Sequence, residues 1–361
     1  MQPALSLPDS LDASLQAHFK RTRDWFTKPD LPSPEAVILG GGYGRGEGGV
    51  AVDDAGKPCF FNDLDYFIFT DHPKDQSLLD AVHQWERDES AILGIDVEGK
   101  CLPKSDLSAT PGSMMFYDLV TAHTQVLGPG NYLAEFKSLA RPETIQPIEA
   151  TRLLWNRGSG LFFARVDLIG RKNLDLVHRN QAKAKLALGD ALLTIRGKYR
   201  PYVVERQLLL KSEPATNPRI VALHEEGAAF KLKPTKVPSL EKLESTQAEL
   251  IEIWQTCFLA IESQRLNYDF TDAGSYIEYS KKLFPETATF KNFALAIRDQ
   301  MKRAGHLSPC FDYPRGALQR ALLALLSDSG DLSAVEKSFN RSLPNLSAAV
   351  EHYTKWWMHY S

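Results

Sequence analysis

Two aspartates, Asp63 and Asp65, stand at the start of the apolar segment NDLDYFIF, residues 62–69. The aromatic and branched residues that follow predict a buried strand, in which residues two apart point to the same side. Two carboxylates crowded on one side of a buried strand repel each other and lose hydration, and a divalent cation relieves both costs. Mg²⁺ and Mn²⁺ suit such oxygen ligands, together with substrate phosphates. The alternative interpretation is a pair of solvated residues at the beginning of a strand.

A glycine-rich stretch, VILGGGYGRGEGG at residues 37–49, precedes the aspartates and contains seven glycines. Glycine loses more backbone freedom on folding than any other residue, so this density needs a reason. We expect a buried strand at 37–39 and a short helix opened by the glycines, which would present free backbone N–H groups to an anion. The spacing matches neither the dinucleotide fingerprint nor the P-loop. The stretch is either a phosphate seat or a tight structural turn.

The two motifs together resemble the DNA polymerase beta-type nucleotidyltransferase superfamily, over roughly residues 35–130. Gly41 and Gly42 match the family's Gly-Ser or Gly-Gly pair, and Arg45 begins its Arg-Gly-Glu tail. Asp63 and Asp65 match its metal-binding Asp-x-Asp. The resemblance implies transfer of a nucleoside monophosphate from a nucleoside triphosphate to an acceptor hydroxyl, with release of pyrophosphate.

Two departures from the family pattern stand out. Many members carry serine where this chain has Gly42, so a hydroxyl that would reach the phosphate is missing. The spacing to the aspartates is also long, because the segment VAVDDAGKPCFF at residues 50–61 reads as an inserted hairpin. A hairpin at this edge is physically harmless, and it is also in a position to lean over the substrate.

The resemblance further implies a third carboxylate on a neighbouring strand, serving as metal ligand and general base. The segment AILGIDVEGKCL at residues 91–102 is predicted to be that strand and offers Asp96, which we favour, and Glu98 as the alternative. Two Mg²⁺ or Mn²⁺ ions would then be held by Asp63, Asp65 and Asp96.

Phosphate contacts are also implied by the resemblance. Gly41 and Gly42 would hold the β- and γ-phosphates. Arg45 would either contact a phosphate or pin Glu47 and the loop.

A basic residue from the helical half would complete the triphosphate site, because related enzymes draw one from there. Lys183 is the candidate, close to one predicted helix face with Arg179 and Asp190. Asp190 would position Lys183 or touch the acceptor, and Arg157 is a weaker candidate. The alternative is a charged surface pair near a helix–helix contact.

The surrounding elements predict a small α/β (α+β) domain with a mixed sheet, followed by a larger all-helical domain. Strand and helix patterns intermix up to about residue 130: a helix at 10–27, strands near 37–39 and 62–69, and a helix at 75–90. Beyond residue 145, helical spacing of apolar residues predominates in six segments, 148–166, 180–197, 202–210, 239–266, 317–326 and 349–360. We therefore predict a nucleotidyltransferase domain at 1–140 and a helical domain at 141–361, subdivided near 212–240.

Composition restricts partners and location. A net charge of -3 over 361 residues argues against long RNA and favours a small molecule or a protein as acceptor. The sequence lacks a signal-peptide pattern and any apolar run near the ~20 residues that span a bilayer, so no membrane association is expected. Four scattered cysteines without C-x-x-C spacing are typical of reduced thiols in a cytoplasmic protein.

Two other functions compete with the enzyme. A non-catalytic nucleotide sensor or scaffold of the same fold would bind nucleotide without turning it over. A helical-domain ribonuclease of the toxin–antitoxin type uses an arginine followed at close spacing by a histidine, and two stretches fit, Arg219 with His224 and Arg171 with His178. With nine histidines in the chain, such matches arise readily by chance.

Overall fold

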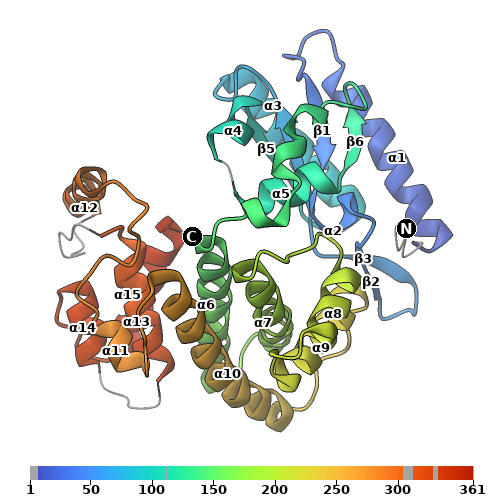
Figure 1. Ribbon diagram of the computed structural model, residues 1–361. Coiled ribbons are helices and arrows are strands. Elements are labelled where there is room, and N and C mark those ends of the chain that lie inside the picture. The colour runs from blue at the N-terminus through green and yellow to red at the C-terminus, as the bar shows by residue number, and fades with distance from the viewer. Residues whose placement is uncertain (1–6, 111, 304–311, 328–331, 361) are drawn as a thin grey trace. The chain divides into compact units, whose positions relative to one another are not determined.

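The computed structural model describes residues 7–110, 112–303, 312–327 and 332–360. The chain divides into two compact units (Figure 1). Unit 1 contains residues 1–149 and 192–236, and unit 2 contains residues 150–191 and 237–361. The division of contacts therefore differs from the predicted boundary at residue 140, because the segment 192–236 packs with the N-terminal part of the chain.

Unit 1 is built on a four-stranded mixed sheet in the order β5-β4-β1-β6 (Figure 1). Its strands are β1 (Ala36–Leu39), β4 (Leu64–Phe69), β5 (Val97–Leu102) and β6 (Thr124–Leu127). Strand β1 runs antiparallel to both β4 and β6, whereas β4 and β5 are parallel. The parallel pair needs a crossover, which the helix α3 (Gln76–Leu93) supplies.

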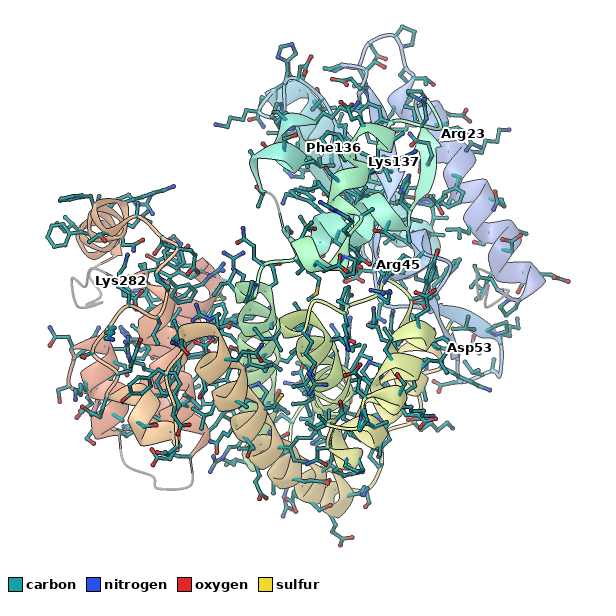
Figure 2. The ribbon with its side chains drawn as sticks, in the orientation of Figure 1. Arg23, Arg45, Asp53, Phe136, Lys137 and Lys282 are labelled. Atoms are coloured by element: carbon teal, nitrogen blue, oxygen red, sulfur yellow. The ribbon has the colours of Figure 1, made fainter. Side chains whose placement is uncertain are left out.

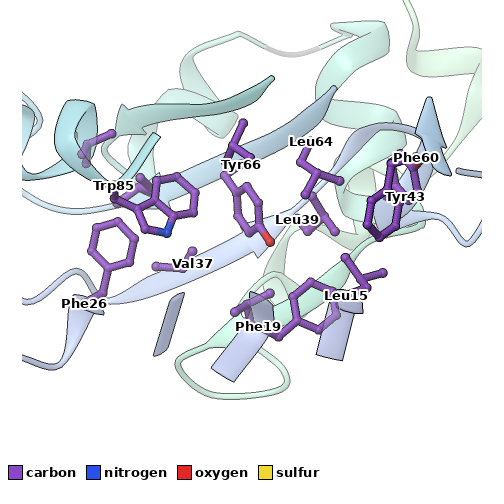
Figure 3. Close-up of a cluster of buried hydrophobic side chains, with 14 of the residues drawn as sticks. Leu15, Phe19, Phe26, Val37, Leu39, Tyr43, Phe60, Leu64, Tyr66 and Trp85 are labelled. Atoms are coloured by element: carbon purple, nitrogen blue, oxygen red, sulfur yellow. The ribbon is translucent and has the colours of Figure 1, made fainter. Parts of the chain in front are cut away.

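Helices cover both faces of this sheet. On one face, α1 (Asp9–Phe26) and α3 bury an aromatic-rich cluster in which the Trp85 and Phe26 rings meet edge to face at 5.3 Å (Figure 3). The other face packs its apolar side chains, among them Ile38 and Phe67, against the helices α4 (Ser105–Ala109), α5 (Met114–Thr121) and η1 (Ala134–Leu139). The sheet is thus the middle layer of a three-layer unit.

The glycine-rich stretch forms a single helical turn, α2 (Gly41–Gly44), directly after β1. A hairpin of β2 (Gly49–Val52) and β3 (Pro58–Phe61) follows, as the sequence predicts. Asp53 at the hairpin tip closes the turn by accepting from two backbone N–H groups (Figure 2). Tyr43 fixes the other end, since its hydroxyl donates to the Gly49 carbonyl at 2.6 Å and accepts from the Phe61 N–H at 2.9 Å.

Two further helices belong to unit 1, α8 (Val203–Ser212) and α9 (Pro218–Leu232). Leu210 of α8 joins a small buried cluster with Tyr117 and Tyr199. The sequence prediction included α8 but missed α9, whose apolar residues do not follow a clear stripe. Its beginning is nonetheless marked by a side-chain cap from Asn217 and by Pro218 at the first position.

Unit 2 is helical in the residues that the structure describes. Two helices, α6 (Ile148–Gly170) and α7 (Leu174–Ile195), run across the boundaries between the units, and the short η2 (Pro142–Thr144) precedes them. The remaining helices are α10 (Leu240–Leu266), α11 (Ala273–Ile277), α12 (Thr289–Arg303), α13 (Arg315–Leu326), α14 (Ser333–Phe339) and α15 (Leu346–Tyr360). Its core includes a buried polar network, in which Glu262 accepts from Tyr276 at 2.9 Å and from Arg265 at 2.7 Å.

The mixed α/β class with a small mixed sheet and many helices is confirmed. One predicted element was wrong in its bounds: the strand expected over 91–102 covers only 97–102. Residues 91–93 complete α3, which ends where Gly94 adopts the left-handed conformation with φ of 71°. Within the described part of the chain, no helix is both long and apolar enough to span a bilayer.

Candidate functional site: an acidic sheet face beside a glycine turn

Asp65 lies directly against the glycine turn. The Asp65 carbonyl accepts a hydrogen bond from the Gly40 N–H at 2.8 Å. Its carboxylate oxygen Oδ2 occupies the place where a Cβ on Gly41 would stand, and Gly41 has a positive φ of 59°. Only glycine meets both conditions without strain, because a side chain there would be in a rarely adopted conformation and would collide with the carboxylate. The motif thus brings a bare backbone turn against a carboxylate.

The strand register places two of the predicted carboxylates on one face of the sheet. Asp65 of β4 pairs with Glu98 of β5, and Leu64 pairs with Val97 on the opposite, buried face. Asp63 was expected on the strand but precedes β4, and Asp96 likewise precedes β5, so alternation along a strand does not fix where these two side chains point. The two segments still lie next to each other, because the Leu64 N–H donates to the Asp96 carbonyl at 2.9 Å. We call this set, Asp63, Asp65, Asp96 and Glu98, the acidic face.

The carboxylates of the acidic face interact electrostatically. The pKa of Glu98 is raised above its ordinary value by partial burial, and then by the negative charges of Asp63, Asp96 and Glu86. Burial raises the pKa of Tyr43 to about 12 against the opposing hydrogen bond with the Phe61 backbone, and Cys59 and then Asp63 add smaller increases. The Asp63 carboxylate thus acts on groups of both the glycine turn and β5.

Asp63 and Asp65 carry the oxygen donors that a hard divalent cation prefers. In the described residues, no group of three or more His, Cys, Asp and Glu side chains is arranged to hold a metal ion. Magnesium needs fewer, since proteins commonly bind it through one or two carboxylates with waters and substrate phosphates completing the shell. The oxygen donors of Asp63 and Asp65 fit that requirement.

A neighbouring residue adds to this site without having been predicted. Asn62, directly before Asp63, has a left-handed φ of 74°, which is uncommon outside glycine. Its side-chain Oδ1 is buried and has no hydrogen-bond partner among the described residues. Asparagine adopts this conformation more readily than other non-glycine residues, so the unsatisfied oxygen rather than the backbone marks this position.

The glycine turn presents backbone donors beside the acidic face. The first intrahelical hydrogen bond of α2 runs from the Gly44 N–H to the Gly40 carbonyl at 2.8 Å. The N–H groups of Gly41, Gly42 and Tyr43 come before it and have no partner within the helix. With no side chain on the first two, an anion can approach these donors closely.

Arg45, predicted to contact a phosphate or to pin Glu47, is bound to a different carboxylate. Its Nη1 lies 3.0 Å from Asp118 Oδ2 on α5, and the Tyr199 hydroxyl donates to the same oxygen at 3.3 Å (Figure 2). Glu47 is held elsewhere, by the Val203 N–H at 2.7 Å and the Lys231 ammonium at 3.3 Å. These contacts join residues more than 70 positions apart, so no local sequence pattern predicts them.

The candidates from the helical half lie in unit 2. Lys183, Arg179 and Asp190 are on α7, and Arg157 is on α6. Their assignment to the triphosphate or the acceptor stays a prediction.

The arginine–histidine pairs gain no support from their surroundings. His224 is completely buried and its Nδ1 lies 2.5 Å from the Gln207 amide oxygen, while Arg219 forms an exposed ion pair with Glu226. A general acid or base for RNA cleavage has to reach its substrate. His178 is only partly buried, and Arg171 lies in the short turn between α6 and α7.

Comparison of the chain with protein-family models, with curated proteins and with solved structures finds no match.

Proposed function

We propose that the acidic face and the glycine turn form the active site of a metal-dependent nucleotidyltransferase. The observation that carries the proposal is the Asp65 carboxylate lying in the space that a Gly41 side chain would fill. This contact joins the two motifs on which the family resemblance rests. The strand order β5-β4-β1 also supports it, because it lines up the third-carboxylate strand, the Asp-x-Asp strand and the strand that leads into the glycine turn.

The proposed reaction moves a nucleoside monophosphate. The oxygen of an acceptor hydroxyl forms a bond to the α-phosphorus of a nucleoside triphosphate, the bond from that phosphorus to the bridging oxygen breaks, and pyrophosphate leaves. The hydroxyl proton passes to a carboxylate of the acidic face. Two bound Mg²⁺ or Mn²⁺ ions, held by Asp63, Asp65 and the third carboxylate, would neutralise charge on the phosphates.

The protein's own groups supply position and charge. The N–H groups of Gly41 and Gly42 would hold the β- and γ-phosphates, with Arg45 as a further cationic contact. Catalysis of this kind depends mainly on alignment of the reacting atoms, since the phosphoryl group needs little covalent help.

The third carboxylate has two candidates with different support. Asp96 is our prediction from the sequence, whereas the register pairs Glu98 with Asp65. Burial and then neighbouring negative charge raise the pKa of Glu98, which favours a role for it as a proton acceptor. Comparing Asp96→Asn with Glu98→Gln in one assay distinguishes the two.

The acceptor is proposed to be a small molecule or a protein in the cytoplasm. A net charge of -3 gives little general attraction for a long RNA. Among the described residues, Cys59, Cys101 and Cys257 form no disulfide with one another, which suits a reducing compartment. Cys310 lies outside the described residues.

Pyrophosphate release tests the proposal. The protein is incubated with each γ-labelled nucleoside triphosphate, Mg²⁺ and a cell extract as the source of acceptor, beside Asp63→Asn and Asp65→Asn. The control is Asp80→Asn, which neutralises an exposed aspartate on α3. We expect release by the wild type and the control, and at least a ~1000-fold loss in the two site variants. Binding without release would show a sensor, and full release by either site variant would overturn the roles of these aspartates.

A further inference from the structure

Glu47 connects the glycine turn to the helices α8 and α9. It is buried, at 1% exposure, and its N–H donates to the Gly42 carbonyl at 2.8 Å. Its side chain reaches the other way: Oε1 accepts from the Val203 N–H at the beginning of α8, and Oε2 from the Lys231 ammonium near the end of α9. Glu47 therefore contacts the glycine turn through its backbone, and through its carboxylate it contacts two helices that are far away in the sequence.

The α9 end of this connection is itself fixed in place. The Phe230 ring packs edge to face on Phe61 of β3, with 5.7 Å between centroids. A Cβ on Gly49 of β2 would stand 2.6 Å from the Lys231 carbonyl, so the hairpin and α9 approach each other closely here. These packing contacts position Lys231. We call its ion pair with Glu47 the strut between α9 and the glycine turn.

Two arginines and one glutamate act on the charge of Lys231. Arg45 and Arg206 lie close enough to Lys231 to disfavour its charged form, and Glu47 favours it. Arg45 is in turn paired with Asp118, and Arg206 donates to the Tyr199 hydroxyl at 3.0 Å. Burial, followed by the two arginines, lowers the pKa of Lys231 to about 8. The ammonium therefore loses its proton in mildly alkaline solution.

We infer that Glu47 and Lys231 are positioning residues, which hold the Gly41–Gly42 turn in the conformation that seats the triphosphate. The inference rests on the proposed function and adds to it a support that comes from α9. When Lys231 is charged, Glu47 is anchored at both oxygens and the Gly42 carbonyl is fixed. When Lys231 is neutral, Glu47 Oε2 loses its cationic partner, the contact between Glu47 and α9 weakens, and the turn is released.

Four variants separate this role from general stability. Lys231→Met and Glu47→Gln remove the ion pair, the second while keeping an amide oxygen for the Val203 N–H. Lys231→Arg keeps the charge and does not titrate below pH 12. The matched control is Lys211→Met, which breaks an exposed ion pair to Glu225 that also joins α8 to α9, without contact to Glu47.

The experiment measures two quantities on each full-length variant. One is the dissociation constant of the α,β-methylene analogues of the four ribonucleoside triphosphates with Mg²⁺, by calorimetry at pH 7 and pH 9. The other is hydrogen exchange of the backbone amides at 40–47 in the absence of nucleotide. We expect Lys231→Met and Glu47→Gln to weaken binding about tenfold at pH 7 and to speed exchange of the Glu47 amide to a similar extent.

The pH dependence carries the sharpest prediction. Wild-type affinity falls towards that of Lys231→Met between pH 7 and pH 9, because the ammonium loses its proton near pH 8. Lys231→Arg binds as the wild type does at pH 7 and shows no such loss. The control follows the wild type at both pH values.

The outcomes separate this inference from the proposed function. If the wild type binds triphosphate but Lys231→Met behaves as Lys211→Met does in both measurements, the positioning role is overturned. A wild type that binds no triphosphate at all overturns the proposed function, and faster exchange in Lys231→Met alone would still support the strut between α9 and the glycine turn.

Discussion

The carboxylates on the two faces of the sheet in unit 1 have opposite electrostatic surroundings. On the α1/α3 face, Glu89 is 4% exposed and fully engaged, with His18 Nδ1 at 2.7 Å and two nitrogens of Arg21 at 2.8 and 2.7 Å. Burial opposes its charge, but the bonds from Arg21 and His18 outweigh burial and hold the pKa of Glu89 below its ordinary value. The other nitrogen of His18 meets the Tyr66 hydroxyl at 2.8 Å.

On the opposite face, carboxylates have been placed beside one another. Partial burial, followed by the negative charges of Asp63, Asp96 and Glu86, raises the pKa of Glu98. Glu89 therefore has partners that favour its charged form, whereas the neighbours of Glu98 disfavour its charge, as we expect at the site that we propose. The pKa shifts of Glu89 and Glu98 run in opposite directions.

The largest effect on stability is expected at the engaged carboxylate. Glu89→Gln leaves Arg21 and His18 with a neutral partner in a buried place and should lower the free energy of unfolding by about 3 kcal/mol. Urea unfolding of the wild type and of this variant measures the difference. A change as small as that of a surface substitution would show that Glu89 is not a structural element.

A second, smaller loss is expected at the glycine turn. Gly41→Ala puts a Cβ at positive φ and against the Asp65 carboxylate, which should lower the free energy of unfolding by about 2 kcal/mol. Gly46→Ala is the matched control, because its φ of 75° is equally unfavourable but its Cβ would meet no atom within 4 Å. If both variants keep full triphosphate binding, the close approach at Gly41 has no functional meaning.

Acidification should destabilise the α1/α3 face first. The pKa of His18 is lowered in the folded protein, chiefly by burial, so below about pH 6.5 the unfolded chain binds more protons than the folded one and stability falls with falling pH. Glu89 acts in the same direction at lower pH, since its folded pKa is also depressed. Thermal unfolding from pH 7.5 to pH 4.5 measures this loss, and His18→Gln should reduce its slope between pH 6.5 and pH 5.5. An unchanged slope would contradict the assignment.

The smallest effect is expected on the acidic face. Glu98→Gln and Asp96→Asn each remove one repelling charge from an exposed position, so stability without metal should stay within about 0.5 kcal/mol of the wild type or rise slightly. The same variants should lose part of the thermal stabilisation that Mg²⁺ with a triphosphate gives the wild type. A large loss of stability without metal would place these carboxylates in the same structural class as Glu89.

The sequence predicted local features well and distant ones poorly. The strands around the two motifs, the hairpin and the helical second half follow from apolar periodicity and turn residues, which are local signals. The end of α3 was misplaced because Ile92 and Ile95 resemble strand residues, while the left-handed Gly94 that ends the helix was not recognised.

The site itself shows the same limit. Asp63, Asp65, Gly41 and Gly42 were predicted from short spacings, and the register places Glu98 rather than Asp96 beside Asp65. The partners of Arg45 and Glu47 come from positions 118, 203 and 231, and such pairings depend on how the chain folds back. Because these partners are so far apart in the sequence, no periodic pattern predicts the contacts.

Metal-dependent binding of a triphosphate tests the central claim most directly. Calorimetry with the α,β-methylene triphosphates, with and without Mg²⁺, is carried out on the wild type, Asp65→Asn and Asp80→Asn. We predict that the wild type and Asp80→Asn bind one of the analogues only when Mg²⁺ is present, and that Asp65→Asn loses this dependence together with most of the affinity. Equal binding by Asp65→Asn, or wild-type binding that ignores Mg²⁺, would contradict a metal–triphosphate site on the acidic face.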